Sequence, residues 1–146
     1  MNLPPHLEPL SSESAWLEAF PIAQVLWPDL SQVAYVLNLH TMTNQGYRLF
    51  GLRHDDRLVS IAGVQEIQLL ARGKILWLFD MATVPDQQGS GFGRHLLKLL
   101  TEYATANGYT RLLLHTSAER SRTIEFYRSE LGNPFGVVFR VVTGAA

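Results

Sequence analysis

Cysteine is missing from the 146-residue chain. Its absence excludes disulfide frameworks, thiolate zinc sites and cysteine nucleophiles, and it fits a reducing compartment. A structural metal is not needed for folding, because a chain of this length buries roughly two-thirds of the surface that its unfolded form exposes. The five histidines have no ligand spacing with acidic residues, so we expect no metal site.

Runs of like charge and long apolar runs are missing as well. The net charge is -1 and the lysines and arginines do not cluster, so the electrostatic footprint of a nucleic-acid-binding protein is absent. No apolar stretch is long enough to span a bilayer. Residues 1–14 lack a basic segment followed by an apolar core, so we expect no signal peptide. The predicted location is the cytoplasm, with no nucleic acid or membrane as partner.

The residues that are present describe a globular chain. Apolar residues make up 47% and charged residues 17% of the sequence, which is the balance of a folded protein and not of a disordered one. The length suits a single domain over residues 1–146. Its first 14 residues, rich in proline, serine and acid, are predicted to be a loose lead-in.

Hydrophobic periodicity and turn residues predict the order of elements. Helices are expected over 15–27, with Pro21 in the first turn, over 31–44, with Asp29 or Ser31 as cap, over 92–107 and over about 120–131. Strands are expected over 47–53, 58–69, 75–84, 111–116 and 135–142. In the second helix, apolar residues at 33, 36 and 37 share one face.

The connections between these elements predict the fold class. Short turns join the first three strands, which therefore form an antiparallel meander. A helix separates residues 75–84 from 111–116, so these two strands should run parallel. The expected fold is α/β (α+β), with a mixed, mostly antiparallel sheet, a central parallel pair and helices on both faces.

A glycine-rich segment between the third strand and the next helix carries the functional prediction. It reads Gln88-Gly89-Ser90-Gly91-Phe92-Gly93. The first N–H groups of a helix have no intrahelical acceptor, and the helix dipole puts partial positive charge there. Glycines let a phosphate approach the backbone closely. The segment therefore predicts a diphosphate site, to which the side chains of Gln88, Ser90 and Arg94 can add donors.

Three kinds of nucleotide site compete for this segment. A P-loop requires a lysine that is absent here. A dinucleotide site requires G-x-G-x-x-G after the first strand and an acid at the end of the next strand, whereas RLLLHT (residues 111–116) ends without one. The third pattern, Q/R-x-x-G-x-G/A, is matched by Gln88-x-x-Gly91-x-Gly93, and it is the acyl-CoA loop of the GNAT N-acetyltransferase superfamily.

The resemblance to that superfamily extends over residues 80–132. The segment 83–97 is similar to the family's strand-to-helix segment, and residues 124–132 (IEFYRSELG) resemble its later F-Y-x-x-x-G helix. The resemblance implies acetyl-CoA as cosubstrate and an amine of a small molecule, peptide or protein as acceptor. It also implies that pantetheine pairs with the backbone at the end of the third strand. The implied CoA contacts are Met81, Ala82, Thr83, Val84, Gln88, Gly89, Ser90, Gly91, Phe92, Gly93, Arg94 and Tyr127.

Catalytic roles are assigned to three residues. The resemblance makes Tyr127 the acid that protonates the departing thiolate. Asp80 and Glu66, on adjacent strands, are the candidate bases that draw a proton from the amine. A backbone amide near Ala82 or Thr83 is the expected oxyanion donor.

The predicted function is therefore N-acetyl transfer by direct attack of the amine within a ternary complex. The alternative from another class is a catalytically inactive CoA-binding sensor or regulatory module, and a third is an ATP or NAD enzyme using the same loop. A second subunit could cover the sheet edge left by the short C-terminus, which would make a homodimer.

Overall fold

The structure is a computed structural model that describes residues 6–144. The chain divides after Leu114 into two compact units. The first unit contains β1 (Leu7–Pro9), α1 (Glu13–Leu26), α2 (Gln32–Asn44), β2 (Tyr47–His54), β3 (Arg57–Leu69), β4 (Gly73–Thr83), the 3-10 turn η1 (Pro85–Gln87), α3 (Phe92–Ala106) and β5 (Leu112–Leu114). The second unit contains α4 (Ser121–Leu131).

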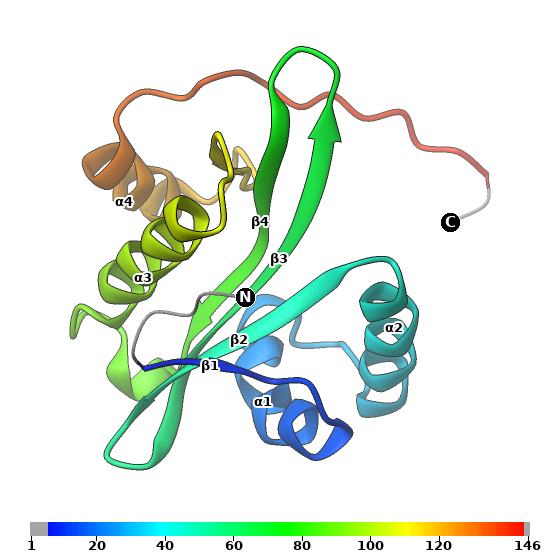
Figure 1. Ribbon diagram of the computed structural model, residues 1–146. Helices are drawn as coiled ribbons and strands as arrows, with labels where there is room; N and C mark the ends of the chain where they lie inside the picture. The colour runs from blue at the N-terminus through cyan, green and yellow to red at the C-terminus, as the bar shows by residue number, and fades with distance from the viewer. Residues whose placement is uncertain (1–5, 145–146) are drawn as a thin grey trace. The chain divides into compact units, whose positions relative to one another are not determined.

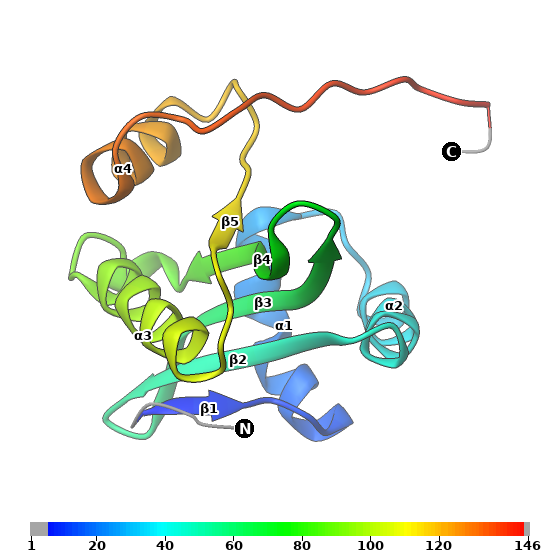
Figure 2. The same cartoon turned by 45° about the horizontal axis from the view of Figure 1, so that its top comes forward.

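The five strands form one sheet in the order β1-β2-β3-β4-β5. Neighbours from β1 to β4 are antiparallel, whereas β4 and β5 are parallel; Figure 2 shows the strands in this order. The predicted mixed, mostly antiparallel sheet is confirmed. Its parallel pair, β4 and β5, lies at one end of the described sheet and not at its centre.

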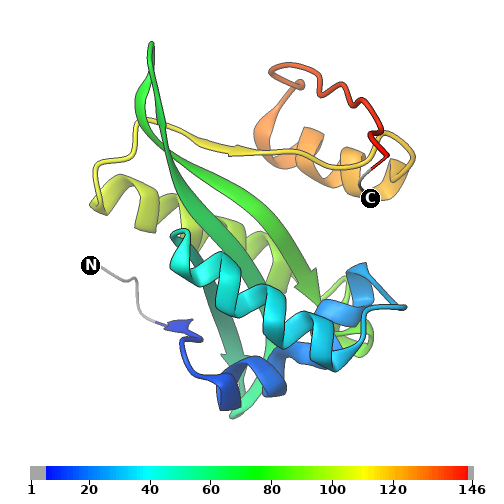
Figure 3. The same cartoon turned by 90° about the vertical axis from the view of Figure 1, so that its right-hand side faces the viewer.

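Helices cover both faces of the sheet, as expected. The first two helices pack on one face and α3 packs on the other (Figure 1). Figure 3 shows α2 in front of the sheet and α3 behind it. The inner face of α3 consists of apolar residues at helical spacing, and these are Leu96, Leu97, Leu99, Leu100, Tyr103 and Ala104. Tyr103 contacts Phe50 of β2 with 5.2 Å between ring centroids.

The predicted loose lead-in is wrong for the residues that the structure describes. Residues 7–9 form β1, which pairs with β2, and Leu7 and Leu10 are only 4% and 1% exposed. Trp16 donates its ring N–H to the carbonyl of Leu10 at 2.8 Å. This segment is ordered because it closes the free edge of β2 and buries two leucines. Residues 1–5 lie outside the described part.

The first helix begins earlier than predicted, whereas the second begins as predicted but buries a different face. The first starts at Glu13, capped by Ser12, so Pro21 lies inside it and not in its first turn. The second is capped by Ser31, one of the two candidates. Its predicted apolar face is not the buried one, because the side chains of Tyr35 and Leu39 turn inward while Val33 remains 70% exposed.

The predicted closing strand of the second unit is wrong as well. Residues 135–142 have strand-like composition but adopt no strand, and their valines stay exposed, Val138 by 70%. A strand needs a ladder partner for its backbone groups, and composition alone does not supply one. The α4 helix agrees with its predicted range. None of the helices in residues 6–144 is long and apolar enough to cross a bilayer.

The burial of α3 predicts where the first unit is sensitive to cavities. Leu100→Ala should lower the free energy of unfolding by about 2–5 kcal/mol, because Leu100 is fully buried and its removal leaves a void. The matched control is Leu37→Ala on α2, where the side chain is 62% exposed. Urea unfolding of both variants measures the difference. Equal losses would contradict the described packing of α3.

Candidate active site

The glycine-rich segment forms a tight turn directly before α3. Gly89 and Gly91 have φ angles of 84° and 89°, in the left-handed region that glycine adopts without strain. A Cβ built at either position would meet no protein atom within 4 Å. The space beside this turn is therefore open to a ligand, and the first N–H groups of α3 have no acceptor within the helix. The geometry fits the pyrophosphate of a nucleotide cofactor.

Two interactions hold the turn against the sheet. The side-chain amide of Gln88 donates to the carbonyl of Thr83 at 3.2 Å, which ties the turn to the end of β4. Arg57 donates twice to the carboxylate of Asp86, at 2.6 and 2.9 Å. These hydrogen bonds lower the pKa of Asp86. Asp86 therefore remains ionised at neutral pH, and Arg57 compensates a negative charge that would otherwise disfavour an anion nearby.

The edge of β4 that faces β5 loses its strand partner before the glycine turn. Residues Leu76–Leu78 pair with Leu112–Leu114 of β5, but β4 continues to Thr83. Among residues 6–114, no strand pairs with this edge of β4 beyond Leu78. The predicted pantetheine contacts Met81, Ala82, Thr83 and Val84 lie in or next to that stretch. A backbone edge without a ladder is where a ligand's amides can pair.

A β-bulge in β4 directs its side chains. Val64 is paired with Leu78 and Gly63 with Asp80, so Phe79 is an extra residue on β4. Bulges re-aim the side chains that follow them. Because side chains alternate along β3, Gly63 and Glu66 lie on opposite faces of the sheet. Asp80, opposite Gly63, lies on the face of α1 and α2, and Glu66 lies on the face of α3.

Asp80 has a buried hydrogen-bond donor in Tyr47. The Tyr47 hydroxyl donates to Oδ2 of Asp80 at 2.6 Å, and Tyr47 is only 4% exposed. Burial and the Asp80 carboxylate together raise the pKa of Tyr47 well above its usual value. The phenol therefore stays protonated and Asp80 accepts its hydrogen bond. Sequence reasoning missed Tyr47, because no motif links it to a residue 33 positions away.

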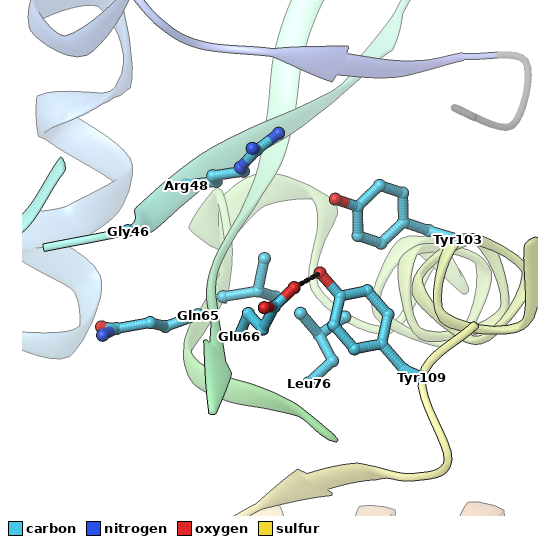
Figure 4. A pocket seen from close by; sticks show the side chains of 8 residues that line it. Gly46, Arg48, Gln65, Glu66, Leu76, Tyr103 and Tyr109 are labelled. Atoms are coloured by element: carbon cyan, nitrogen blue, oxygen red, sulfur yellow. Dashed lines mark hydrogen bonds between the residues drawn. The ribbon is translucent and has the colours of Figure 1, made fainter. Parts of the chain in front are cut away.

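Glu66, the other predicted base, faces a different part of the molecule. Tyr109 donates to Glu66 at 3.1 Å and Lys74 lies 3.8 Å from it. Figure 4 shows Glu66 and Tyr109 pointing toward each other and Gln65 pointing away. A pocket of about 200 Å³ lies here, and its lining residues are Gly46, Arg48, Val64, Gln65, Glu66, Leu76, Tyr103 and Tyr109. Tyr103 belongs to the C-terminal end of α3, whereas the glycine turn is at its N-terminus.

The other predicted residues have the following positions. Phe92, Gly93 and Arg94 form the first turn of α3. Tyr127 lies on α4 of the second unit, where its ring packs edge-on against Phe126 with 5.3 Å between centroids. Its catalytic role stays a prediction. Within residues 6–144, no group of histidine and acidic side chains could hold a metal ion.

Comparison with known proteins identifies the family. A family model described as the acetyltransferase (GNAT) family matches residues 13–132. An uncharacterized N-acetyltransferase from Bacillus subtilis (strain 168), YhdJ, is 25% identical over 128 residues, which cover 87% of this chain and 90% of the relative.

Solved structures agree in fold. An aminoglycoside acetyltransferase, meta-AAC0020, from an uncultured soil metagenomic sample, in complex with sisomicin, has a TM-score of 0.79 at 15% identity, with 94% of each chain covered. The aminoglycoside N-acetyltransferase AAC(6')-Iy in complex with CoA has a TM-score of 0.77 at 15% identity, covering 98% of this chain and 100% of that chain. The family match spans both the glycine turn and α4, so the chain belongs to the GNAT acetyltransferase family.

Proposed function

We propose that this acetyltransferase transfers the acetyl group of acetyl-CoA to a primary amine of a small molecule, by direct attack of the amine within a ternary complex. The observation that carries the proposal is the glycine turn that opens α3 where β4 ends. That turn offers N–H groups, partial positive charge and open space to a diphosphate. The same turn is adjacent to a β4 edge that has no ladder partner in the first unit.

In this proposal the backbone of residues 88–94 binds the CoA pyrophosphate. The first turn of α3 supplies N–H groups, and the Arg94 side chain adds positive charge. Pantetheine lies along β4 from Met81 to Val84, where its amides satisfy strand N–H and C=O groups. An N–H near Ala82 or Thr83 then stabilises the oxyanion that forms when the amine attacks the thioester.

Asp80 is the proposed general base. An aliphatic amine has a pKa of about 10 and is protonated at neutral pH, so it must lose a proton before it attacks. Asp80 follows the last β4–β5 pair directly after the bulge and is only part-buried. It can therefore take that proton directly or through a water. Glu66 is less suitable, because it lies on the other face and is engaged with Tyr109 and Lys74.

Tyr127 is the proposed general acid. A free thiol titrates near about 8.5 and a tyrosine near about 10, and burial raises the pKa of Tyr127 above that ordinary value. The phenol therefore stays protonated at neutral pH and can donate a hydrogen bond to the departing thiolate. The support for this assignment is the match of residues 124–132 to the family's tyrosine segment, which falls inside the family match.

Small molecules with several amines are the proposed acceptors. Similar structures are described as aminoglycoside acetyltransferases, so sisomicin and related aminoglycosides belong in the first panel of amines, with polyamines and lysine peptides. Release of free CoA thiol measures turnover with each of them. Binding of CoA without acetylation of any amine would favour the alternative, a CoA-binding regulatory module.

The glycine turn predicts a selective loss of CoA affinity in Gly91→Ala. A Cβ at this left-handed position strains the backbone and occupies the space through which a phosphate approaches, so the Kd for CoA should rise by about tenfold or more. The matched control is Gly108→Ala at the other end of α3, where φ is 76° and the surroundings are equally open. Calorimetric titration should give a near-normal Kd for that control. Equal affinities in the two variants would argue against the phosphate site.

Two isosteric amide variants distinguish the candidate bases. Asp80→Asn should lower kcat/KM for the amine by about 10²–10⁴-fold, because the amide cannot accept the proton. Glu66→Gln should leave it within about twofold, because Glu66 acts only through Tyr109 and Lys74 in this proposal. Titration with CoA checks that both variants still bind the cosubstrate. The reverse pattern would move the base to the other face of the sheet.

Removal of the Tyr127 hydroxyl tests the acid. Tyr127→Phe should lower kcat by about a hundredfold or more with little change in the KM for acetyl-CoA, because only the protonation of the leaving thiolate is lost. Tyr109→Phe serves as control, since its hydroxyl contacts only the pocket around Glu66 in the proposal. An unchanged kcat in Tyr127→Phe would exclude Tyr127 as the acid.

A further inference from the structure

Opposite Asp80, β3 carries a glycine whose missing side chain makes room for a tyrosine. A Cβ added to Gly63 would lie 1.6 Å from the Tyr47 hydroxyl oxygen and 2.2 Å from the ring carbon that bears it. Gly63 and Asp80 are cross-strand partners. The phenol thus crosses over the backbone of β3 to reach the carboxylate on β4, which only a residue without a side chain at 63 permits.

We propose that Tyr47 is a positioning residue for Asp80, which fixes the carboxylate of the general base through one short hydrogen bond over Gly63. The inference rests on the proposed function, in which Asp80 takes the proton of the amine. Tyr47 touches neither amine nor thioester in this arrangement. It acts by orienting the carboxylate that takes the proton.

The donor is itself rigid. Tyr47 is the first residue of β2 and is almost fully buried, so its ring has little freedom to leave Asp80. A buried phenol that donated to nothing would carry a desolvation cost, and the bond of 2.6 Å to Asp80 removes that cost. Each partner therefore holds the other: the carboxylate satisfies the buried hydroxyl, and the hydroxyl restrains the carboxylate.

The titratable groups around the pair come from several elements. Tyr47 itself belongs to β2. Tyr35 of α2 is near enough to raise the pKa of Tyr47 electrostatically. Tyr35 donates its own hydroxyl to the carbonyl of Trp16 at 2.7 Å. The acids of α1 are paired elsewhere, Glu13 with His40 and Glu18 with Arg53.

The sign of the effect on Asp80 follows from the direction of the bond. A hydrogen bond donated to a carboxylate favours its ionised form. Loss of the Tyr47 hydroxyl should therefore disfavour ionisation of Asp80, and a larger fraction of the enzyme would carry a protonated, inactive base at low pH. The activity that depends on Asp80 would then be lost at a higher pH as the solution is acidified.

The experiment compares pH profiles of kcat/KM for the amine in Tyr47→Phe and Tyr35→Phe. Both variants remove one buried hydroxyl from the same face of the sheet, but only the first removes a hydrogen bond to Asp80. At low pH each profile has an acid limb, along which kcat/KM falls as the solution is acidified. In Tyr47→Phe this limb should move to higher pH by about one unit, and the maximal kcat/KM should fall by about tenfold. CoA affinity should stay unchanged. In Tyr35→Phe the limb should keep its position.

A second variant tests the same hydrogen bond by changing Gly63 in place of Tyr47. Gly63→Ala leaves every hydroxyl in place but displaces the Tyr47 ring, so it should also move the acid limb upward. If the limb stays in place in Tyr47→Phe and Gly63→Ala while Asp80→Asn is inactive, the inference fails and the proposed function stands. If Asp80→Asn is fully active, the proposed base fails as well. A limb that moves equally in Tyr35→Phe would mean a general loss of stability and would also overturn the inference.

Discussion

The constraint on which this structure depends is the way β4 ends. Over Leu76–Leu78 the strand is paired on both sides, and after one extra residue, Phe79, it keeps only β3 as partner among residues 6–114. It then stops at Thr83 and turns through two left-handed glycines into α3. A strand edge without a ladder partner in the first unit is therefore followed along the chain by a helix N-terminus, and the backbone groups of both can accept a ligand's hydrogen bonds. The family's cosubstrate, acetyl-CoA, has amides for the one and a diphosphate for the other.

The bulge links this edge to the chemistry proposed for it. Without the extra residue, the side chains after Leu78 would keep the alternation of the strand, and Asp80 would face α3 together with Leu76 and Leu78. With it, Asp80 turns to the face of α1 and α2, where Tyr47 reaches it over Gly63. The extra residue thus puts Asp80 and Glu66, which are equal candidates for the general base in the sequence, on opposite faces of the sheet. Of these two carboxylates, only Asp80 accepts a hydrogen bond from a buried tyrosine, at 2.6 Å.

Much of the fold could be predicted from the sequence because its elements carry local signals. The turn glycines, the helical spacing of Leu96, Leu97 and Leu100, and the capping serine at position 31 act within a few residues of themselves. Features that depend on distant partners could not be predicted. Leu7 and Leu10 are ordered by β2, the inward face of α2 is decided by Tyr35 and Leu39, and residues 135–142 look like a strand without having a ladder. For the same reason the glycine turn could be found from its motif, whereas Tyr47 required the register of three strands.

The most direct test of the account is an NMR titration of the isotope-labelled protein with CoA, followed at individual backbone amides. The account predicts the largest shift changes in the amides of residues 88–94, with further changes from Met81 to Val84, because these groups would gain the hydrogen-bond partners that the fold leaves to a ligand. Saturable binding with those amides unchanged, and the shifts confined to another surface such as the pocket around Glu66, would contradict it.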